Sequence, residues 1–133
     1  MELTPEQALQ QGVAAHKEGK LQEAERLYRA ILQSQPKHPD ANHNLGVLAL
    51  SVNQAQAALP FFQTAVDANP NIEQFWLSYI EALIAVGQIE NAKQALKKGK
   101  KKGVAKKKLK ALSRKLMSVK AGNHPVQALA QAE

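Results

Sequence analysis

The stretch GKLQEAERLYRAILQSQPKHPDANHNLG, residues 19–46, holds the pattern that decides the fold. It begins with a glycine, continues with apolar residues spaced by three or four positions, and reaches a proline at Pro36. This spacing gathers the apolar side chains on one face of a helix, and proline is typical just beyond a helix end. A second helix should start near Asp40, because an acidic residue suits a first turn. The stretch therefore predicts two amphipathic helices joined by a short turn.

Similar glycine, alanine, aromatic and proline residues recur along the chain at a spacing of 34 residues. The aligned positions are Gly12 with Gly46, Gly19 with Asn53 and Gly87, Ala24 with Ala58 and Ala92, Tyr28 with Phe62, and Pro36 with Pro70. A period of this length indicates stacked helix pairs, because one pair cannot bury its apolar faces alone. Pro60 predicts a late start or a slight kink in its helix, since proline lacks a backbone N–H. We expect one domain over 1–120 with repeats 5–38, 39–72 and 73–106.

The charges divide the chain into two parts. The net charge is +7, yet residues 1–96 hold 6 Lys or Arg against 10 Asp or Glu, whereas residues 97–120 hold 12 Lys or Arg and no acid. The chain has no cysteine, which excludes disulfides, thiolate catalysis and cysteine-ligated zinc. No apolar run reaches the ~20 residues that span a bilayer. These features predict a soluble, cytoplasmic protein.

The basic segment combines an apolar stripe with its lysines. Ala105, Leu109, Leu112, Leu116 and Val119 recur at steps of three and four, which predicts a basic cap helix over about 104–120. A flexible tail or linker should follow over 121–133. The lysines fit the solvent-exposed face of such a cap helix. Alternatively, they form an anion site for an acidic partner or nucleic acid. The candidate anion-binding residues are Lys101, Lys102, Lys106, Lys107, Lys108, Lys110, Arg114 and Lys115.

The residues at the repeated positions resemble those of tetratricopeptide repeat proteins. The resemblance rests on NLG at 44–46, on Gly19, Ala24, Tyr28 and Pro36, on Ala58, Phe62, Ala65 and Pro70, and on Trp76, Gly87 and Ala92. It implies an all-α, right-handed solenoid of three helix-turn-helix repeats plus a C-terminal capping helix. The third unit departs from the pattern, because Ile80 replaces the small crossing residue, Gly99 the late alanine and Val104 the closing proline.

The family resemblance also implies a concave groove lined by the first helix of each pair. Several of its apolar residues are not required by the core, and such a run favours a protein-binding surface. The expected groove residues are Leu9, Gln10, Val13, His16, Lys17, Asp40, His43, Asn44, Val47, Leu50, Ser51, Gln74, Leu77, Ser78, Glu81 and Ile84.

Asn44 is the polar residue of greatest interest in that groove. In several members of the family the asparagine before "LG" holds the backbone of a bound peptide, and an amide can donate and accept at once. The members that clamp chaperone C-terminal carboxylates use lysines, an arginine and two asparagines. The matching positions here are Leu9, Val13, Asn44, Gln74 and Ser78, and only Asn44 fits. The resemblance therefore argues against that ligand class.

We expect a scaffold that binds a protein or peptide and has no catalysis of its own. The four histidines, His16, His38, His43 and His124, lack the arrangement of a metal or catalytic site, and no phosphate-binding glycine loop is present. Neither a metal nor a cofactor is expected. A nucleic-acid or polyanion-binding accessory protein, acting through 97–120, is one alternative. The first two units also resemble the repeat region of bacterial O-GlcNAc-transferase-like proteins, which implies a substrate-presenting arm of a larger glycosyltransferase or methyltransferase as another. A monomer or weak homo-oligomer fits either reading.

Overall fold

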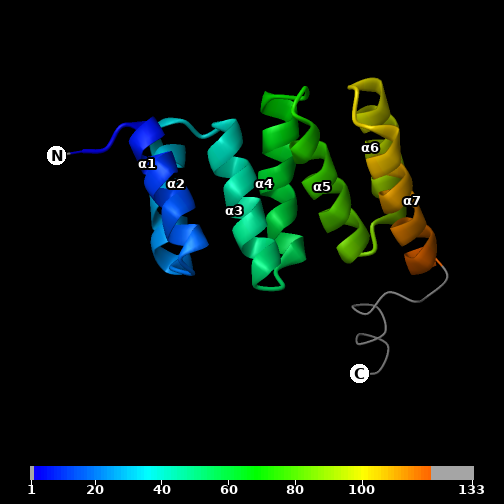
Figure 1. The fold of residues 1–133 in the computed structure, drawn as a ribbon, viewed down its shortest axis with the longest axis horizontal. Coiled ribbons are helices and arrows are strands. Elements are labelled where there is room, and N and C mark those ends of the chain that lie inside the picture. The colour runs from blue at the N-terminus through cyan, green and yellow to red at the C-terminus, as the bar shows by residue number, and fades with distance from the viewer. Residues whose placement is uncertain (1, 121–133) are drawn as a thin grey trace. The chain divides into compact units, whose positions relative to one another are not determined.

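The structure is a computed structural model that describes residues 2–120, and the tail expected over 121–133 lies outside them. The described residues form seven helices and no strand, which confirms the all-α fold (Figure 1). The chain divides into two compact units, residues 1–69 and 70–133. The first holds α1 (Pro5–Lys17), α2 (Leu21–Ser34), α3 (Pro39–Ser51) and α4 (Ala55–Ala68), and the second holds α5 (Glu73–Ala85), α6 (Ile89–Lys101) and α7 (Lys106–Lys120).

The helices begin at the spacing that the sequence indicates. The first helices of the pairs start at residues 5, 39 and 73, and the second helices at 21, 55 and 89. The turns inside the pairs hold Gly19, Asn53 and Gly87 at φ values of 80°, 60° and 78°. Glycine and asparagine tolerate this left-handed backbone, so the aligned residues serve one purpose in each turn. Helix α7 begins at residue 106, one position before the next period would place it.

Close helix crossings explain Gly12 and Gly46 in the first unit. The Tyr28 ring lies against Gly12, where an added Cβ would approach the Tyr28 Cε1 atom to 2.5 Å. The Phe62 ring lies in the same way against Gly46. Tyr28 also packs with Leu45 of α3, so the aromatic side chain joins its own pair to the next. A larger residue at either glycine would separate the helices of its pair.

A second periodic contact ties each connecting loop to a first helix. The Asn42 amide donates to the carbonyl of Pro36 at 3.1 Å, and the Trp76 indole donates to the carbonyl of Pro70 at 2.8 Å. Asn42 and Trp76 differ in chemistry but stand 34 residues apart, as do the two prolines. Both bonds therefore hold a loop carbonyl against the helix that follows it.

Pro60 does not delay the start of its helix. Helix α4 begins at Ala55, so Pro60 lies in its interior rather than in its first turn. Proline lacks the N–H that would bond the carbonyl of Gln56. The cost falls on an exposed position, where water can satisfy that carbonyl. The Thr64 hydroxyl donates to the Pro60 carbonyl at 2.9 Å.

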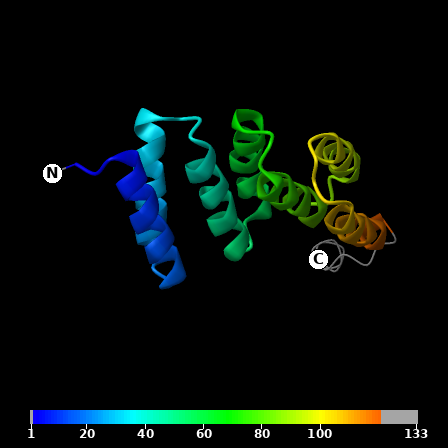
Figure 2. The same ribbon diagram turned by 45° about the horizontal axis from the view of Figure 1, so that its top comes forward.

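In the second unit, α7 packs on both α5 and α6. Helices α6 and α7, yellow and orange in Figure 2, lie side by side and are in contact. Four residues of the predicted stripe, Leu109, Leu112, Leu116 and Val119, are buried, each at most 8% exposed. The fifth, Ala105, was wrongly included, because it is exposed and precedes the start of α7. These four residues therefore form the apolar side of α7. Gly103, at φ 93°, supplies the turn that leads into it.

Candidate functional site

In the first unit, α1 and α3 lie in contact and carry the expected groove residues at matching helix positions. The core side of α1 is formed by buried Ala8, Gly12 and Ala15. The residues beside that core side stay accessible. Leu9, Val13, His16, His43, Asn44, Val47 and Leu50 are half-buried, whereas Gln10, Lys17, Asp40 and Ser51 are exposed. We call these eleven residues the α1–α3 surface.

One residue of the α1–α3 surface, Leu9, also packs against the core. Leu9 packs against two buried clusters, one containing Tyr28 and Leu45 and the other containing Leu27 and Ile31. Val13 and Val47 are at the same helix position on α1 and α3 and remain half-buried. The surface therefore presents two valines and Leu50 between polar groups, a mixture that can hold a partner's apolar side chain.

Asn44 lies among the polar groups of this surface. Burial raises the pKa of the Tyr28 hydroxyl, and the Asn44 side chain opposes that shift in part. Burial likewise lowers the pKa of His43, against the opposing effects of Asn44 and the Asp40 charge. The His43 ring lies 5.5 Å from the Phe62 ring, centroid to centroid, and is tilted by 47°. Within residues 2–120 the buried Tyr28 hydroxyl has no hydrogen bond of ordinary geometry.

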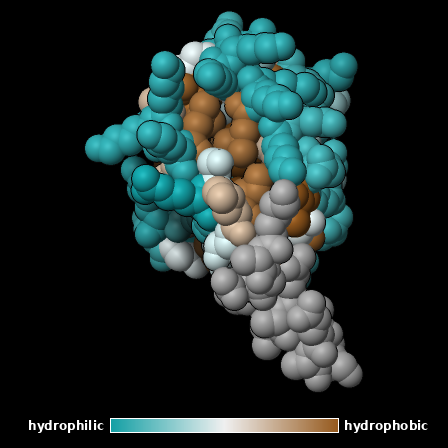
Figure 3. All heavy atoms as spheres, turned by 90° about the vertical axis from the view of Figure 1, so that its right-hand side faces the viewer, coloured by the Kyte–Doolittle hydropathy of each residue, from teal (hydrophilic) through white to brown (hydrophobic). Residues whose placement is uncertain are grey.

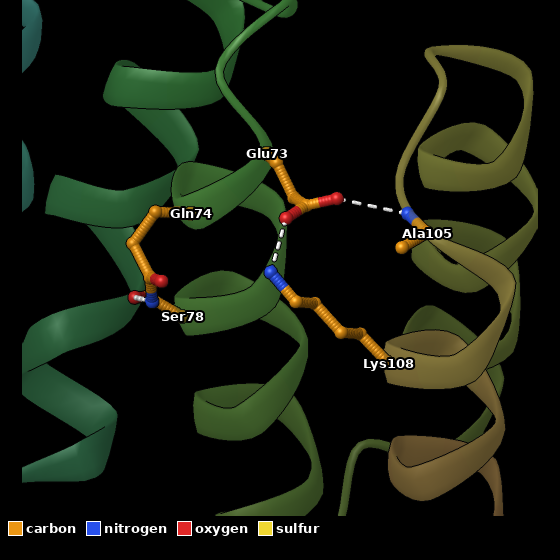
Figure 4. A network of polar contacts seen from close by, with 5 residues as sticks. All are labelled: Glu73, Gln74, Ser78, Ala105 and Lys108. Carbon is orange, nitrogen blue, oxygen red and sulfur yellow. Dashed lines mark hydrogen bonds and ion pairs between the residues drawn. The ribbon is translucent and has the colours of Figure 1, made fainter.

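The five groove residues expected on α5 differ in accessibility, because Gln74 and Glu81 are exposed whereas Ser78 and Ile84 are buried. Ile84 is fully buried and Ser78 is 6% exposed, so neither side chain presents a free surface. The Gln74 amide donates to the Ser78 hydroxyl at 3.1 Å (Figure 4). Glu81 forms an ion pair with Lys115 of α7 at 3.0 Å, and Leu77 is half-buried. Helix α7 thus engages Glu81, whereas Gln74 and Ser78 bond each other within α5.

The cations of the basic segment fall into two groups. Lys108 and Lys115 pair with Glu73 and Glu81 of α5. The other candidate anion-binding residues are exposed and form no salt bridge within residues 2–120; they are Lys101, Lys102, Lys106, Lys107, Lys110 and Arg114. Two of the eight candidate cations therefore form ion pairs with α5, and the other six remain exposed.

Two features of the second unit were not expected from the sequence. The Glu73 carboxylate accepts hydrogen bonds from Ala105 and Lys108 at the start of α7. In the sequence, Glu73 is recognisable merely as an acid in the first turn of a helix. An apolar groove also lies between α6 and α7, lined in part by Leu96, Lys97 and Lys100. The sequence could have indicated this groove, because Ser113 is the eighth residue of α7, and the eighth residues of α1 and α3 are Gly12 and Gly46.

Searches for other kinds of site in the described part of the chain give two findings. Residues 2–120 contain no group of three or more His, Cys, Asp or Glu side chains arranged to hold a metal ion. Among the same residues, none of the helices combines the length and apolar character needed to cross a bilayer.

Comparisons with known proteins agree with the repeated helix pairs. Two family models, both described as tetratricopeptide repeat, match residues 9–73 and 49–116. The chain belongs to the tetratricopeptide repeat family. A comparison with curated protein sequences finds no match.

Several solved structures share the fold of this tetratricopeptide repeat protein. A MamA fragment from Desulfovibrio magneticus RS-1, residue 41 to the end, is 25% identical with a TM-score of 0.74, and the match covers 94% of this chain and 70% of that one. The Sgt2 TPR domain from Aspergillus fumigatus is 21% identical with a TM-score of 0.75, covering 91% and 84%. The first TPR of Spaghetti (RPAP3), bound to the HSP90 peptide SRMEEVD, is 19% identical with a TM-score of 0.77, covering 91% and 98%.

Proposed function

We propose that this protein is a non-catalytic, cytoplasmic scaffold that binds an extended segment of a partner protein on its α1–α3 surface. The observation that carries the proposal is the repeated stripe itself. Val13 and Val47, at one helix position on two adjacent helices, remain half-buried although the core side of each helix is already filled. Apolar groups aligned in this way favour a contact with another molecule.

The polar residues of the surface suit the backbone of a bound peptide. The Asn44 amide can donate to a peptide carbonyl and accept from a peptide N–H, so it can read an extended backbone without regard to sequence. Each such bond contributes a net ~1 kcal/mol. Exposed Gln10 and Asp40 supply polar groups at the edge of the same surface. We therefore expect affinity from backbone bonds and selectivity from the fit around Val13, Val47 and Leu50.

The solved structure of Spaghetti with an HSP90 peptide supports a peptide-binding role for a chain of this fold. The residue pattern does not support the same ligand class, because the positions that would hold a terminal carboxylate are Leu9, Val13, Gln74 and Ser78 beside Asn44. We expect a ligand without a required acidic C-terminus.

A peptide-display selection tests the proposal. Peptides enriched on the intact chain should lose binding to the double variant Asn44→Ala with Leu50→Glu by about tenfold or more, because a charge faces the apolar stripe and a backbone bond is removed. The matched control is Ala30→Glu with Gln33→Ala, which likewise adds one glutamate and removes one side-chain amide, on exposed positions of α2. Equal binding by both variants would refute a role for the α1–α3 surface.

A further inference from the structure

A shallow groove of about 430 Å³ lies between α6 and α7 in the second unit. Its floor is apolar, since Leu96 is half-buried and Leu109 is 8% exposed. Figure 3, which faces this side of the molecule, shows hydrophobic residues in a hollow framed on both sides by hydrophilic ones. The lining residues are Leu96, Lys97, Lys100, Lys106, Leu109, Lys110 and Ser113.

The packing in the first unit shows what kind of element such a groove accepts. There α3 contacts α2 and α1, and α4 covers the free side of α3 with Phe62 against Gly46. In the second unit α7 contacts α6 and α5 in the same way. Ser113 occupies the helix position of Gly46, but none of the described helices covers it. The groove is therefore the place where a helix like α4 would pack.

The rim of the groove sets the charge of the occupant. Lys97, Lys100, Lys106 and Lys110 all line it, and no acidic residue does. Within residues 2–120 none of these four forms a salt bridge, in contrast to Lys108 and Lys115 on the side of α5. Their aliphatic stems extend the apolar floor while the ammonium groups face water. An occupant with carboxylates beside an apolar stripe would neutralise this rim.

We propose that the α6–α7 groove binds an acidic amphipathic helix from a partner protein. The partner would place leucine-like side chains over Leu96, Leu109 and Ser113 and glutamates or aspartates against the four lysines. The chain's own residues 121–133 fit this description poorly, because they contain one acid, Glu133. A nucleic acid would meet the lysines but make no use of the apolar floor. The site is separate from the α1–α3 surface and does not depend on the function proposed there.

A designed peptide tests the groove on the intact chain. The probe is a fluorescent helix of about 18 residues with a leucine stripe flanked by glutamates, long enough to be helical in water. We expect saturable binding by fluorescence anisotropy. Replacing Lys97, Lys100, Lys106 and Lys110 by glutamate should weaken it by about tenfold or more, since several rim pairs become repulsive. Ser113→Trp, which fills the groove without changing its charge, should weaken it as well.

The matched control reverses four lysines outside the groove, Lys98, Lys101, Lys102 and Lys107, and gives the same net charge. It should change the affinity by less than about threefold, and circular dichroism melts should show both variants folded. Equal losses in the two variants would overturn the proposal, because binding would then follow net charge alone. Tighter binding of single-stranded RNA at the same groove residues, or failure of the probe to bind, would overturn it too.

The chain's own tail and a second copy are checked in the same protein. Because the chain has no cysteine, Ala130→Cys gives a single site for a spin label. Broadening of the Leu96 and Ser113 amide signals by that label would place residues 121–133 in the groove and overturn the proposal. Dimerisation that competes with the probe in sedimentation experiments would do the same. The absence of both, with probe-induced shifts at Leu96 and Ser113, supports a partner helix.

Discussion

The carboxylate of Glu73, at the start of α5, accepts a hydrogen bond from the backbone amide of Ala105 at 2.9 Å, directly before α7 begins. The other oxygen of the same carboxylate bonds the ammonium group of Lys108 in the first turn of α7 (Figure 4). The first amides of a helix lack partners within the helix, and a negative charge near them is favourable. One acid thus satisfies the start of α7 from 32 residues away.

Removal of this acid should loosen α7 without unfolding the rest of the second unit. Glu73→Ala takes away both bonds, so we expect faster hydrogen exchange at the α7 amides and little change in α6. Mass spectrometry of exchanged peptides measures this directly. The control is Glu90→Ala, which removes an exposed acid that pairs with Lys93 of its own helix. Unchanged protection in α7 would show that its apolar stripe alone fixes the helix.

The same contact predicts an acid-dependent release of α7. The hydrogen bond from Lys108, with the Ala105 amide second, lowers the pKa of Glu73 below its ordinary value of 4.5. The stabilising effect is therefore complete above pH 4.5 and is lost as the pH falls through the lower, folded-state pKa. Exchange at α7, corrected for its intrinsic pH dependence, should rise in that window in the natural chain. In Glu73→Ala the rise should be absent.

The helix pairs could be predicted from sequence because their causes are local. Apolar spacing marks the buried faces, and the residues at Gly19, Asn53 and Gly87 mark the turns. The late helix start predicted from Pro60 was wrong, because a single exposed proline can lie within a helix that buries Ala58 and Phe62. Tertiary packing decided that helix boundary.

The accessible surface was harder to predict, because exposure depends on what packs alongside. Val47 and Ile84 both fit an outward-facing stripe by their spacing, yet Ile84 is fully buried. Trp76 and Asn42 make the same loop contact with unlike side chains, so a residue type alone does not reveal it. The contacts of Glu73 with α7 span more than 30 residues and leave no periodic trace. Long-range contacts of this kind need the structure.

The glycine at a close helix crossing should be far less tolerant than one in a looser contact. Gly46→Ala would drive a Cβ into the Phe62 ring, and we expect a loss of about 1–3 kcal/mol in the free energy of unfolding. Gly99 is also buried, but there an added Cβ would meet Val104 Cγ2 at 3.4 Å, an ordinary contact. Gly99→Ala should therefore be neutral or stabilise by up to about 1 kcal/mol, since alanine favours the helix. Urea denaturation of the two variants measures the contrast, and equal losses would contradict the crossing argument.

The buried hydroxyl of Tyr28 predicts a stabilising deletion. Within the described residues this hydroxyl has no ordinary hydrogen bond, and its side chain is fully buried. Tyr28→Phe keeps the ring against Gly12 and removes an unsatisfied polar group, so we expect a gain of about 1 kcal/mol in unfolding free energy. Chemical denaturation provides the measurement. A loss of similar size would show that the hydroxyl has a partner in solution.

His43 predicts that stability falls in mildly acidic solution. Burial lowers its pKa in the folded chain below the 6.5 of an exposed imidazole, although Asn44 and Asp40 oppose the shift. As the pH falls through 6.5, the unfolded chain therefore binds a proton before the folded chain does. The contribution of His43 to the free energy of unfolding is complete above pH 6.5. It declines below that pH and levels off below the folded-state pKa. Urea midpoints between pH 8 and 5 should show a smaller decline in His43→Gln than in the natural chain. His16→Gln is the control for loss of one imidazole, and an undiminished decline in His43→Gln would assign the pH dependence to other groups.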